Sequence, residues 1–359
     1  MKYLRSFFAT VLVICLLFSL SGCHKKGEVA LTADGYDITA GMYSYYLTMA
    51  DSDAKALISS SDEYDVSAKG FSYLKQNIDG KSYSTYVKEL AITKCLEAIA
   101  YQKLCDDNKI TLTDEMIENG NYQAELYWDY YGYSSVLEPN GISLETYKKA
   151  ILNTLYSDAY FKHLYDKDGE KAISDKDISD TLVDKFAAVY MLNKNYSSDS
   201  TADATKLEKD FNDYKARLEK GEDFEKIYNE FNGIKEDATK EEESEDDDTP
   251  SAKDDLIQII GAKDTFVEFE HFDKAKALKE GAIEVIHDTT NKQLYLLVKK
   301  DISADSYYKD EYLKTEIMYL LKGDEYDKLI DEKVKALEYT TDSRVIDLFK
   351  VKNIADGTN

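Results

Sequence analysis

The spacing of apolar residues predicts that the first half of the chain is mainly helical. Apolar side chains recur there every three to four residues, the period of an amphipathic helix. This period predicts helices within residues 39–58, 83–107 and 142–159, and a further helix after Thr113. Thr39 and Thr113 precede two of these runs and are expected to be their N-cap residues.

A short hairpin is expected before the first helix. Val29 to Ala33 has the pattern of a strand, and a second short strand follows Asp34 and Gly35. The Asp-Gly pair suits a two-residue hairpin turn, because both central positions of such a turn need a positive φ.

Residues 185–303 have a different pattern, in which strand-like and helical runs are mixed. The expected order is strand, helix, helix, strand, helix, strand, strand, at residues 186–192, 205–220, 224–231, 256–260, 272–279, 283–287 and 294–299. Thr205 and Glu208 form a capping box at which the first of these helices is expected to begin. Residues 288–291 read as the hairpin connection between the last two strands.

The last part of the chain is expected to be helical over residues 305–335, followed by a short strand at 345–351. The whole pattern therefore predicts the α+β class, with a small mixed-sheet unit placed between helical segments.

The first 22 residues have the pattern of a cleaved targeting signal. Lys2 and Arg5 precede an apolar run that is shorter than the roughly 20 residues needed to span a membrane. Leu20-Ser-Gly-Cys23 resembles the lipobox of bacterial lipoproteins, in which the signal is cut before a cysteine that becomes lipidated. The resemblance implies a lipid anchor on Cys23 at the outer face of a bacterial membrane. A secretory signal and a short membrane anchor are the alternatives.

The chain is strongly acidic, with 70 Asp and Glu against 45 Lys and Arg among 359 residues. The net charge of −25 argues against nucleic acid as a partner and against unaided binding to anionic lipid. It favours solubility and attraction to basic unfolded proteins. The densest acidic run, residues 235–255, is expected to be disordered because it has almost nothing apolar to bury. Calcium binding is the alternative, although EF-hand spacing is absent.

Tyrosine is unusually frequent, with 30 residues. A tyrosine combines a packing ring with a polar tip, so it suits half-exposed contact surfaces. A general preference for Tyr over Phe is the simpler explanation of the count. One aromatic cluster predicts either core and loop packing or a client-binding surface; it contains Tyr127, Trp128, Tyr130, Tyr131 and Tyr133.

The mixed unit resembles the parvulin family of peptidyl-prolyl isomerases at three places in the family's order. Arg217–Phe224 is similar to a family stretch that ends in Lys-x-Gly-x-x-Phe. Ala277–Ile283 is similar to the family's Ala-Leu-x-x-Gly-x-Ile, and Leu294–Val298 lies where the family has Tyr-His-Ile-Ile. The resemblance implies a proline-binding site on one face of a small sheet.

The family's two site histidines correspond here to Tyr190 and Tyr295. The apolar proline pocket corresponds to Phe266 and Phe272, or to their neighbours Val267 and His271 if the register differs by one. Isomerisation is rotation about a partial double bond with a barrier of about 18–20 kcal/mol and needs no covalent chemistry. Losing both histidines therefore weakens the catalytic interpretation without excluding it. We expect Tyr190, Tyr295, Phe266 and Phe272 to bind an apolar or prolyl side chain, and no catalytic residue is assigned.

Three other stretches resemble secreted foldases of the SurA and PrsA type, at residues 29–39, 108–117 and 173–178. This resemblance implies a discontinuous helical chaperone domain, formed by residues 23–182 and by C-terminal helices within 305–359. A degenerate parvulin-like domain, residues 183–304, would interrupt it.

Together the resemblances imply a membrane-anchored, extracytoplasmic chaperone or foldase that binds unfolded secreted polypeptides. An active isomerase is one alternative. A solute-binding lipoprotein is another, although that class needs alternating strands and helices in two lobes. The oligomeric state is left open, a dimer included.

No cofactor or metal site is expected. The histidines show no ligand spacing; they are His24, His163, His271 and His287. Cys95 and Cys105 lie on one expected helix, about 15 Å apart along its axis, which is too far for a disulfide. Both are therefore expected to be free or buried thiols.

Overall fold

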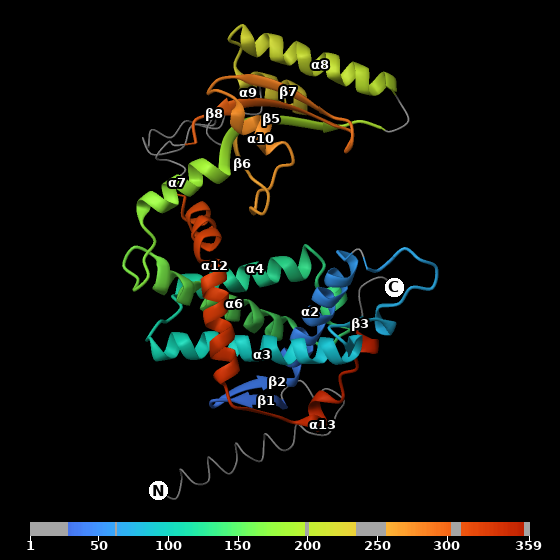
Figure 1. Cartoon of the computed structure of the whole chain (residues 1–359), viewed down its shortest axis with the longest axis vertical. Coiled ribbons are helices and arrows are strands. Elements are labelled where there is room, and N and C mark those ends of the chain that lie inside the picture. Colours follow the sequence, from blue (N-terminus) through green and yellow to red (C-terminus); the bar gives the residue numbers. More distant parts are fainter. Residues whose placement is uncertain (1–27, 62, 198–200, 235–255, 303–309, 355–359) are drawn as a thin grey trace, which may run out of the picture. The chain divides into compact units, whose positions relative to one another are not determined.

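The computed structural model describes residues 28–61, 63–197, 201–234, 256–302 and 310–354. These residues form two compact units. The first unit holds the described residues up to Ala172 and those from Asp324 onward, and the second holds those between Ile173 and Gly323. Helix α12 (Glu311–Ala336) contributes to both (Figure 1). The predicted α+β class is confirmed.

Two expected segments, the targeting signal with Cys23 and the acidic run at 235–255, lie outside the described residues. Among the helices that are described, none combines the length and the apolar character needed to cross a membrane.

The first unit is mainly helical. Before Ala172 it contains β1 (Val29–Ala33), β2 (Tyr36–Thr39), α2 (Ala40–Ser59), η1 (Tyr73–Lys75), β3 (Asn77–Ile78), β4 (Lys81–Ser82), α3 (Tyr83–Asp107), α4 (Asp114–Asp129), α5 (Ser134–Leu137) and α6 (Leu144–Tyr165). After Asp324 it contains the end of α12, β9 (Tyr339–Thr341), α13 (Ser343–Ile346) and η4 (Val351–Asn353).

Local signals in the sequence set the ends of several elements in this unit. The β1–β2 hairpin turns at Asp34 and Gly35, whose φ angles are 46° and 86°, as the Asp-Gly pair predicts. The Thr39 hydroxyl accepts a hydrogen bond from the Met42 amide at 3.3 Å, and Thr113 accepts one from the Met116 amide at 3.2 Å. Both predicted N-caps are therefore confirmed.

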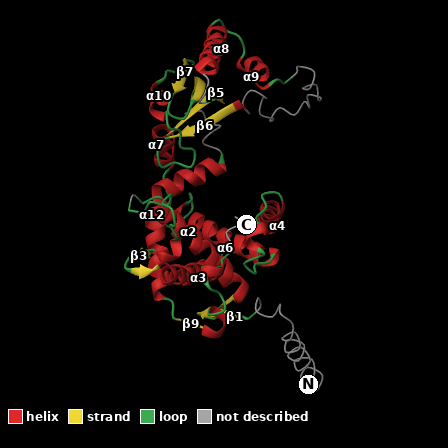
Figure 2. Ribbon diagram, turned by 90° about the vertical axis from the view of Figure 1, so that its right-hand side faces the viewer, coloured by secondary structure: helices red, strands yellow, loops and turns green. Residues whose placement is uncertain are grey.

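The C-terminal tail pairs with the N-terminal hairpin. Strand β9 runs antiparallel to β1, with Thr341 opposite Leu31 and Tyr339 opposite Ala33 (Figure 2). The prediction of a strand at 345–351 is wrong, because that stretch contains the end of α13 and the start of a 3₁₀ turn. No sequence pattern predicts strand β9, because its three residues are all exposed and show no alternation of polarity.

The end of α12 packs into the helical core through Tyr326, which is 2% exposed. Its ring meets Phe161 edge to face at 5.2 Å and stacks on Tyr101 at 6.4 Å. Its hydroxyl donates a hydrogen bond to the Ser157 carbonyl at 2.9 Å. The segment after Asp324 therefore completes a core that is otherwise built from α3 and α6. In α3, Cys95 and Cys105 are free and buried, as expected.

The second unit is built on a four-stranded antiparallel sheet with strand order β6-β5-β8-β7. Its elements are α7 (Asp175–Lys185), β5 (Phe186–Asn195), α8 (Thr201–Glu219), α9 (Phe224–Asn232), β6 (Ile257–Gly261), α10 (Phe272–Ala277), β7 (Ile283–Asp288), β8 (Gln293–Lys300) and the start of α12. The predicted order of strands and helices is confirmed.

Helix α8 starts earlier than predicted. It begins at Thr201, so Thr205 and Glu208 lie inside the helix rather than at its cap. Ala202 and Ala204 have the highest helix propensity of any residue type, which favours extending the helix beyond the expected start.

Each face of the sheet is covered by different elements (Figure 1). Helices α8 and α9 bury one face through Phe211, Phe224 and Ile227. Helix α10 and the segment before it bury the other face through Phe272 and Ala275. Successive residues of a strand point to opposite faces, so the register of β5 and β8 decides which side chains can share a site.

Candidate functional site

Tyr190 lies on the sheet face that α8 and α9 cover. Its ring stacks on that of Phe224, with centroids 4.6 Å apart and planes inclined by 12°. The Lys300 ammonium lies 4.5 Å from the centre of the same ring. Tyr190 therefore packs against residues of α9 and β8 on this face of the sheet.

Tyr295 lies on the opposite face of the same sheet. It belongs with the core cluster that includes Met191, Phe272 and Leu297, whereas Tyr190 belongs with the other cluster. The pairing of Tyr190 with Val298 and of Met191 with Leu297 explains the separation, since Tyr295 and Leu297 are two residues apart and share a face. The expectation that Tyr190 and Tyr295 line one site is thus corrected, and Met191 replaces Tyr190 beside Tyr295.

Three half-buried rings meet on the Tyr295 face. Phe269 meets Tyr295 edge to face at 5.1 Å, and His271 meets Tyr295 at 5.7 Å and Phe269 at 5.7 Å. Phe272 lies in the core of this face and is 6% exposed. Such rings form an aromatic surface that could accept an apolar or prolyl side chain.

Phe266 does not join this group. It is 38% exposed, and its ring contacts Phe186 at 5.7 Å and Tyr312 at 5.5 Å. Of the four predicted residues, the structure therefore brings only Tyr295 and Phe272 together, in the cluster on one face of the sheet. Phe269 and Met191 belong to this face but not to the predicted set, and His271 enters that set only if the register differs by one.

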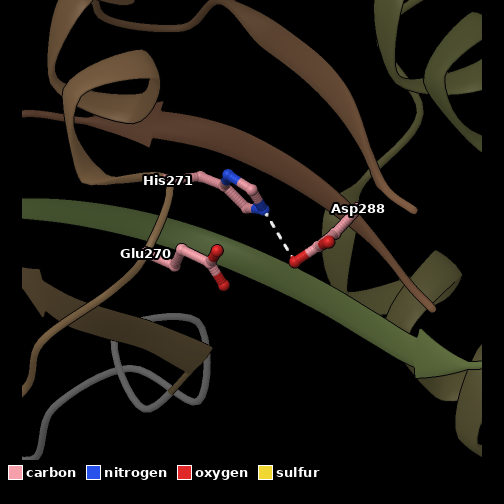
Figure 3. A group of neighbouring side chains, drawn as sticks. All are labelled: Glu270, His271 and Asp288. Atoms are coloured by element: carbon pink, nitrogen blue, oxygen red, sulfur yellow. Dashed lines mark hydrogen bonds and ion pairs between the residues drawn. The ribbon is translucent and has the colours of Figure 1, made fainter. Parts of the chain in front are cut away.

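A polar network borders the aromatic rings. The His271 Nε2 atom lies 3.1 Å from the Asp288 carboxylate, and Glu270 lies beside them (Figure 3). Asp288 is 4% exposed and accepts hydrogen bonds at 2.9 Å from the amides of Thr290 and Asn291 and from the Asn291 side chain. Hydrogen bonds from the Asn291 amide and side chain, together with His271, lower the pKa of Asp288 to about 2.

The sequence shows no ligand spacing among the histidines, yet the fold brings His271 close to two carboxylates. Potential ligand atoms of Glu270, His271 and Asp288 lie within 4.8 Å of one another. The carboxylate of Asp288, however, already accepts four hydrogen bonds from its own loop and from His271. These bonds account for its burial, and the network serves to hold the β7–β8 connection against His271.

A second candidate surface lies on the helical unit, where α4 ends. We call it the tyrosine surface; it consists of Tyr127, Tyr130, Tyr131 and Tyr133. Tyr130 is 78% exposed and Tyr131 is 57% exposed. The four rings are linked by contacts of 5.1–5.4 Å, namely Tyr130 with Tyr131, Tyr127 with Tyr131, and Tyr127 with Tyr133.

The tyrosine surface rests on a buried base. Trp128 and Tyr147 are buried beneath it with Leu137 and Ile142. Gly132 has a φ of 72°, which lets the chain turn between Tyr131 and Tyr133. The aromatic cluster seen in the sequence therefore divides into a core part, Trp128, and an exposed part formed by the four tyrosines.

The chain was compared with known families, curated sequences and solved structures, and the matches found are likenesses of fold. No family model and no curated protein sequence matches the chain. Similar solved structures include a foldase protein PrsA from Streptococcus pneumoniae, with 18% identity, a TM-score of 0.41 and coverage of 76% of this chain and 97% of that one. PrsA from Bacillus subtilis has 16% identity, a TM-score of 0.36 and coverage of 74% and 91%. Both of these structures carry the name PrsA.

Proposed function

We propose that this protein is an extracytoplasmic folding factor that binds unfolded secreted polypeptides and is anchored to the membrane by a lipid on Cys23. The signal would comprise residues 1–22. The helical chaperone domain would comprise residues 23–182 and 305–359, interrupted by a largely non-catalytic domain at 183–304. The net charge of −25 makes nucleic acid an unsuitable partner.

The observation that carries this proposal is the tyrosine surface. Folded proteins in solution seldom expose contiguous apolar surface, and where they do it often marks an interaction site. Four linked rings project from a buried base at the end of α4. Tyrosine rings pack against apolar segments of varied sequence while their hydroxyls stay hydrated. Such a surface suits transient contact with many different unfolded chains.

The sheet unit supports a binding role more than a catalytic one. The positions that the parvulin resemblance equates with two site histidines hold Tyr190 and Tyr295, which lie on opposite sheet faces. A pair of side chains separated in this way cannot act together on one prolyl bond. The rings around Tyr295 can still contact an apolar side chain.

The function is tested by the aggregation of an unfolded client. The mature chain, residues 23–359, is expected to suppress light scattering by a denatured protein at near-stoichiometric ratios. The physical reason is that contact with the tyrosine surface covers apolar segments that would otherwise associate. Unchanged scattering across several chemically different clients would contradict the proposal.

A second candidate function, prolyl isomerisation, is favoured by one observation. His271, held by Asp288, lies against Tyr295 on the face that also contains Phe272. An apolar face with a fixed polar group could prefer the twisted amide of the transition state.

Refolding of a client limited by proline isomerisation separates the two candidates, because the uncatalysed step takes tens of seconds or longer. We expect the refolding rate to be unchanged by the mature chain. An acceleration that Tyr295→Ala abolishes and Tyr190→Ala preserves would establish the second candidate. Tyr190→Ala is the matched control because it also removes a tyrosine ring, but from the opposite face of the sheet.

The remaining alternative, a solute-binding lipoprotein, is not supported by the fold. That class needs alternating strands and helices in two lobes. The first unit is instead mainly helical, and the second is an antiparallel sheet with helices on its faces.

A further inference from the structure

A pocket in the helical unit has walls of mixed character. It has a volume of about 330 Å³ and is formed by residues of α2, α3 and α6. Tyr45, Tyr46 and Tyr101 supply aromatic surface. The volume is at the lower end of the range of about 300–1,000 Å³ typical of small-molecule sites, so a single long side chain would fill much of it.

The ionisable groups of the pocket are mainly acidic. Its lining includes the carboxylates of Asp53, Glu97 and Asp158 and a single ammonium group, that of Lys94. Lys94 is 2.7 Å from Asp53, so its charge is already paired. The pocket therefore has an excess of negative charge.

Glu97 is a pocket carboxylate in unfavourable surroundings. Its side chain is half-buried, and no hydrogen bond or ion pair links it to another residue in the described part of the chain. Burial raises its pKa; Lys94 counteracts this, while Asp331 and Asp327 of α12 raise it further. A cation placed next to Glu97 would offset the cost of burying its negative charge. It would also offset the repulsion from Asp327 and Asp331.

The polar side chains at the base of the pocket are fixed before any ligand arrives. Asn153 is 7% exposed. Its Nδ2 group donates to the Tyr46 hydroxyl at 3.0 Å, and its Oδ1 atom accepts from the Gln102 side chain at 2.7 Å. These bonds hold Tyr46 in place as a rigid wall, which lowers the entropic cost of binding.

We propose that this pocket binds the arginine side chain of an unfolded polypeptide, with the guanidinium group on Glu97 and against the tyrosine rings. A guanidinium group is planar and weakly hydrated, pairs with a carboxylate through two parallel hydrogen bonds and stacks on aromatic faces. Lysine offers a point charge without this planar fit. The proposal rests on the proposed function, because the arginine belongs to a client segment.

The test uses two unstructured, fluorescein-labelled peptides that differ at one position, arginine in one and its neutral isostere citrulline in the other. The mature chain is expected to bind the arginine peptide about tenfold more tightly, as measured by fluorescence anisotropy at low salt. Glu97→Gln is expected to remove this preference. Glu145→Gln, which changes an exposed carboxylate on α6 outside the pocket, is expected to keep it.

Folding of the variants is checked by thermal unfolding. Glu97→Gln is expected to melt no lower than the parent chain, because it removes a half-buried negative charge that lies near other carboxylates. Asp158→Asn provides a second test should the first variant fold poorly, and it too is expected to reduce the preference.

Two outcomes overturn the inference while leaving the proposed function standing. One is a chain that suppresses aggregation yet binds both peptides equally. The other is an arginine preference that persists in Glu97→Gln, or in Asp158→Asn should Glu97→Gln fold poorly. An arginine preference that depends on Glu97, in a chain that suppresses no aggregation, supports the pocket and contradicts the proposed function.

Discussion

Replacing Tyr326 with alanine is expected to destabilise the helical unit by about 3–5 kcal/mol, the range typical of removing a large buried aromatic ring. The ring is 2% exposed and contacts the rings of Phe161 and Tyr101. Its removal leaves a cavity where the end of α12 packs against the rest of the unit. If the tail of the chain completes this core, the loss must be large.

The matched control is Tyr326→Phe, which keeps the ring and removes the hydroxyl that donates to the Ser157 carbonyl. That change is expected to cost about 1 kcal/mol, with the carbonyl losing one partner. Urea unfolding can be followed by the fluorescence of Trp128, the single tryptophan of the chain, which is buried in the same unit. A loss below about 1 kcal/mol for Tyr326→Ala would show that the tail contributes little to this core.

The long helices could be predicted from the sequence because both their period and their ends are local signals. The apolar stripe of α3 and the hydroxyls of Thr39 and Thr113 act within a few residues of where they stand. The order of strands and helices in the sheet unit could be predicted for the same reason, because each element has its own local pattern. Helix α8 begins before the capping box that the sequence offers at Thr205, because the residues before Thr205 are themselves helical.

The composition of the site could not be predicted, because it depends on strand register. Strand β5 is apolar on both faces, so alternation of polarity does not tell which of Tyr190 and Met191 points towards Tyr295. A shift of one residue exchanges the two faces. The family resemblance selected Tyr190, whereas the pairing of β5 with β8 places Met191 beside Leu297 and on the face of Tyr295.

Contacts between segments far apart in the chain also could not be predicted from the sequence. Strand β9 pairs with β1 across about 300 residues through exposed side chains that carry no periodic signal. His271 and Asp288 are 17 residues apart, and their contact depends on the segment before α10 folding against the β7–β8 hairpin. Counting histidine spacing therefore could not reveal this network.

The second large effect is expected at the tyrosine surface. Replacing Tyr130 and Tyr131 together with serine removes the two most exposed rings of that surface while leaving Trp128 and the buried base in place. Tyrosine is among the residues that most often cost more than 1 kcal/mol when truncated in an interface. We expect client suppression to need about tenfold more protein, which corresponds to about 1.4 kcal/mol of lost binding free energy.

The matched control is the double change Tyr312→Ser and Tyr339→Ser. These two tyrosines are 64% and 47% exposed and lie outside the tyrosine surface. If exposed tyrosine in general served to hold clients, this control would lose as much activity as the first variant. The proposal instead expects it to behave like the parent chain.

The most direct measurement of the central claim is therefore the concentration of mature chain that halves the aggregation of one denatured client, compared among the parent, the Tyr130/Tyr131 variant and the Tyr312/Tyr339 control. The account predicts near-stoichiometric suppression by the parent and the control and a roughly tenfold weaker effect for the Tyr130/Tyr131 variant. Equal suppression by all three proteins would contradict it.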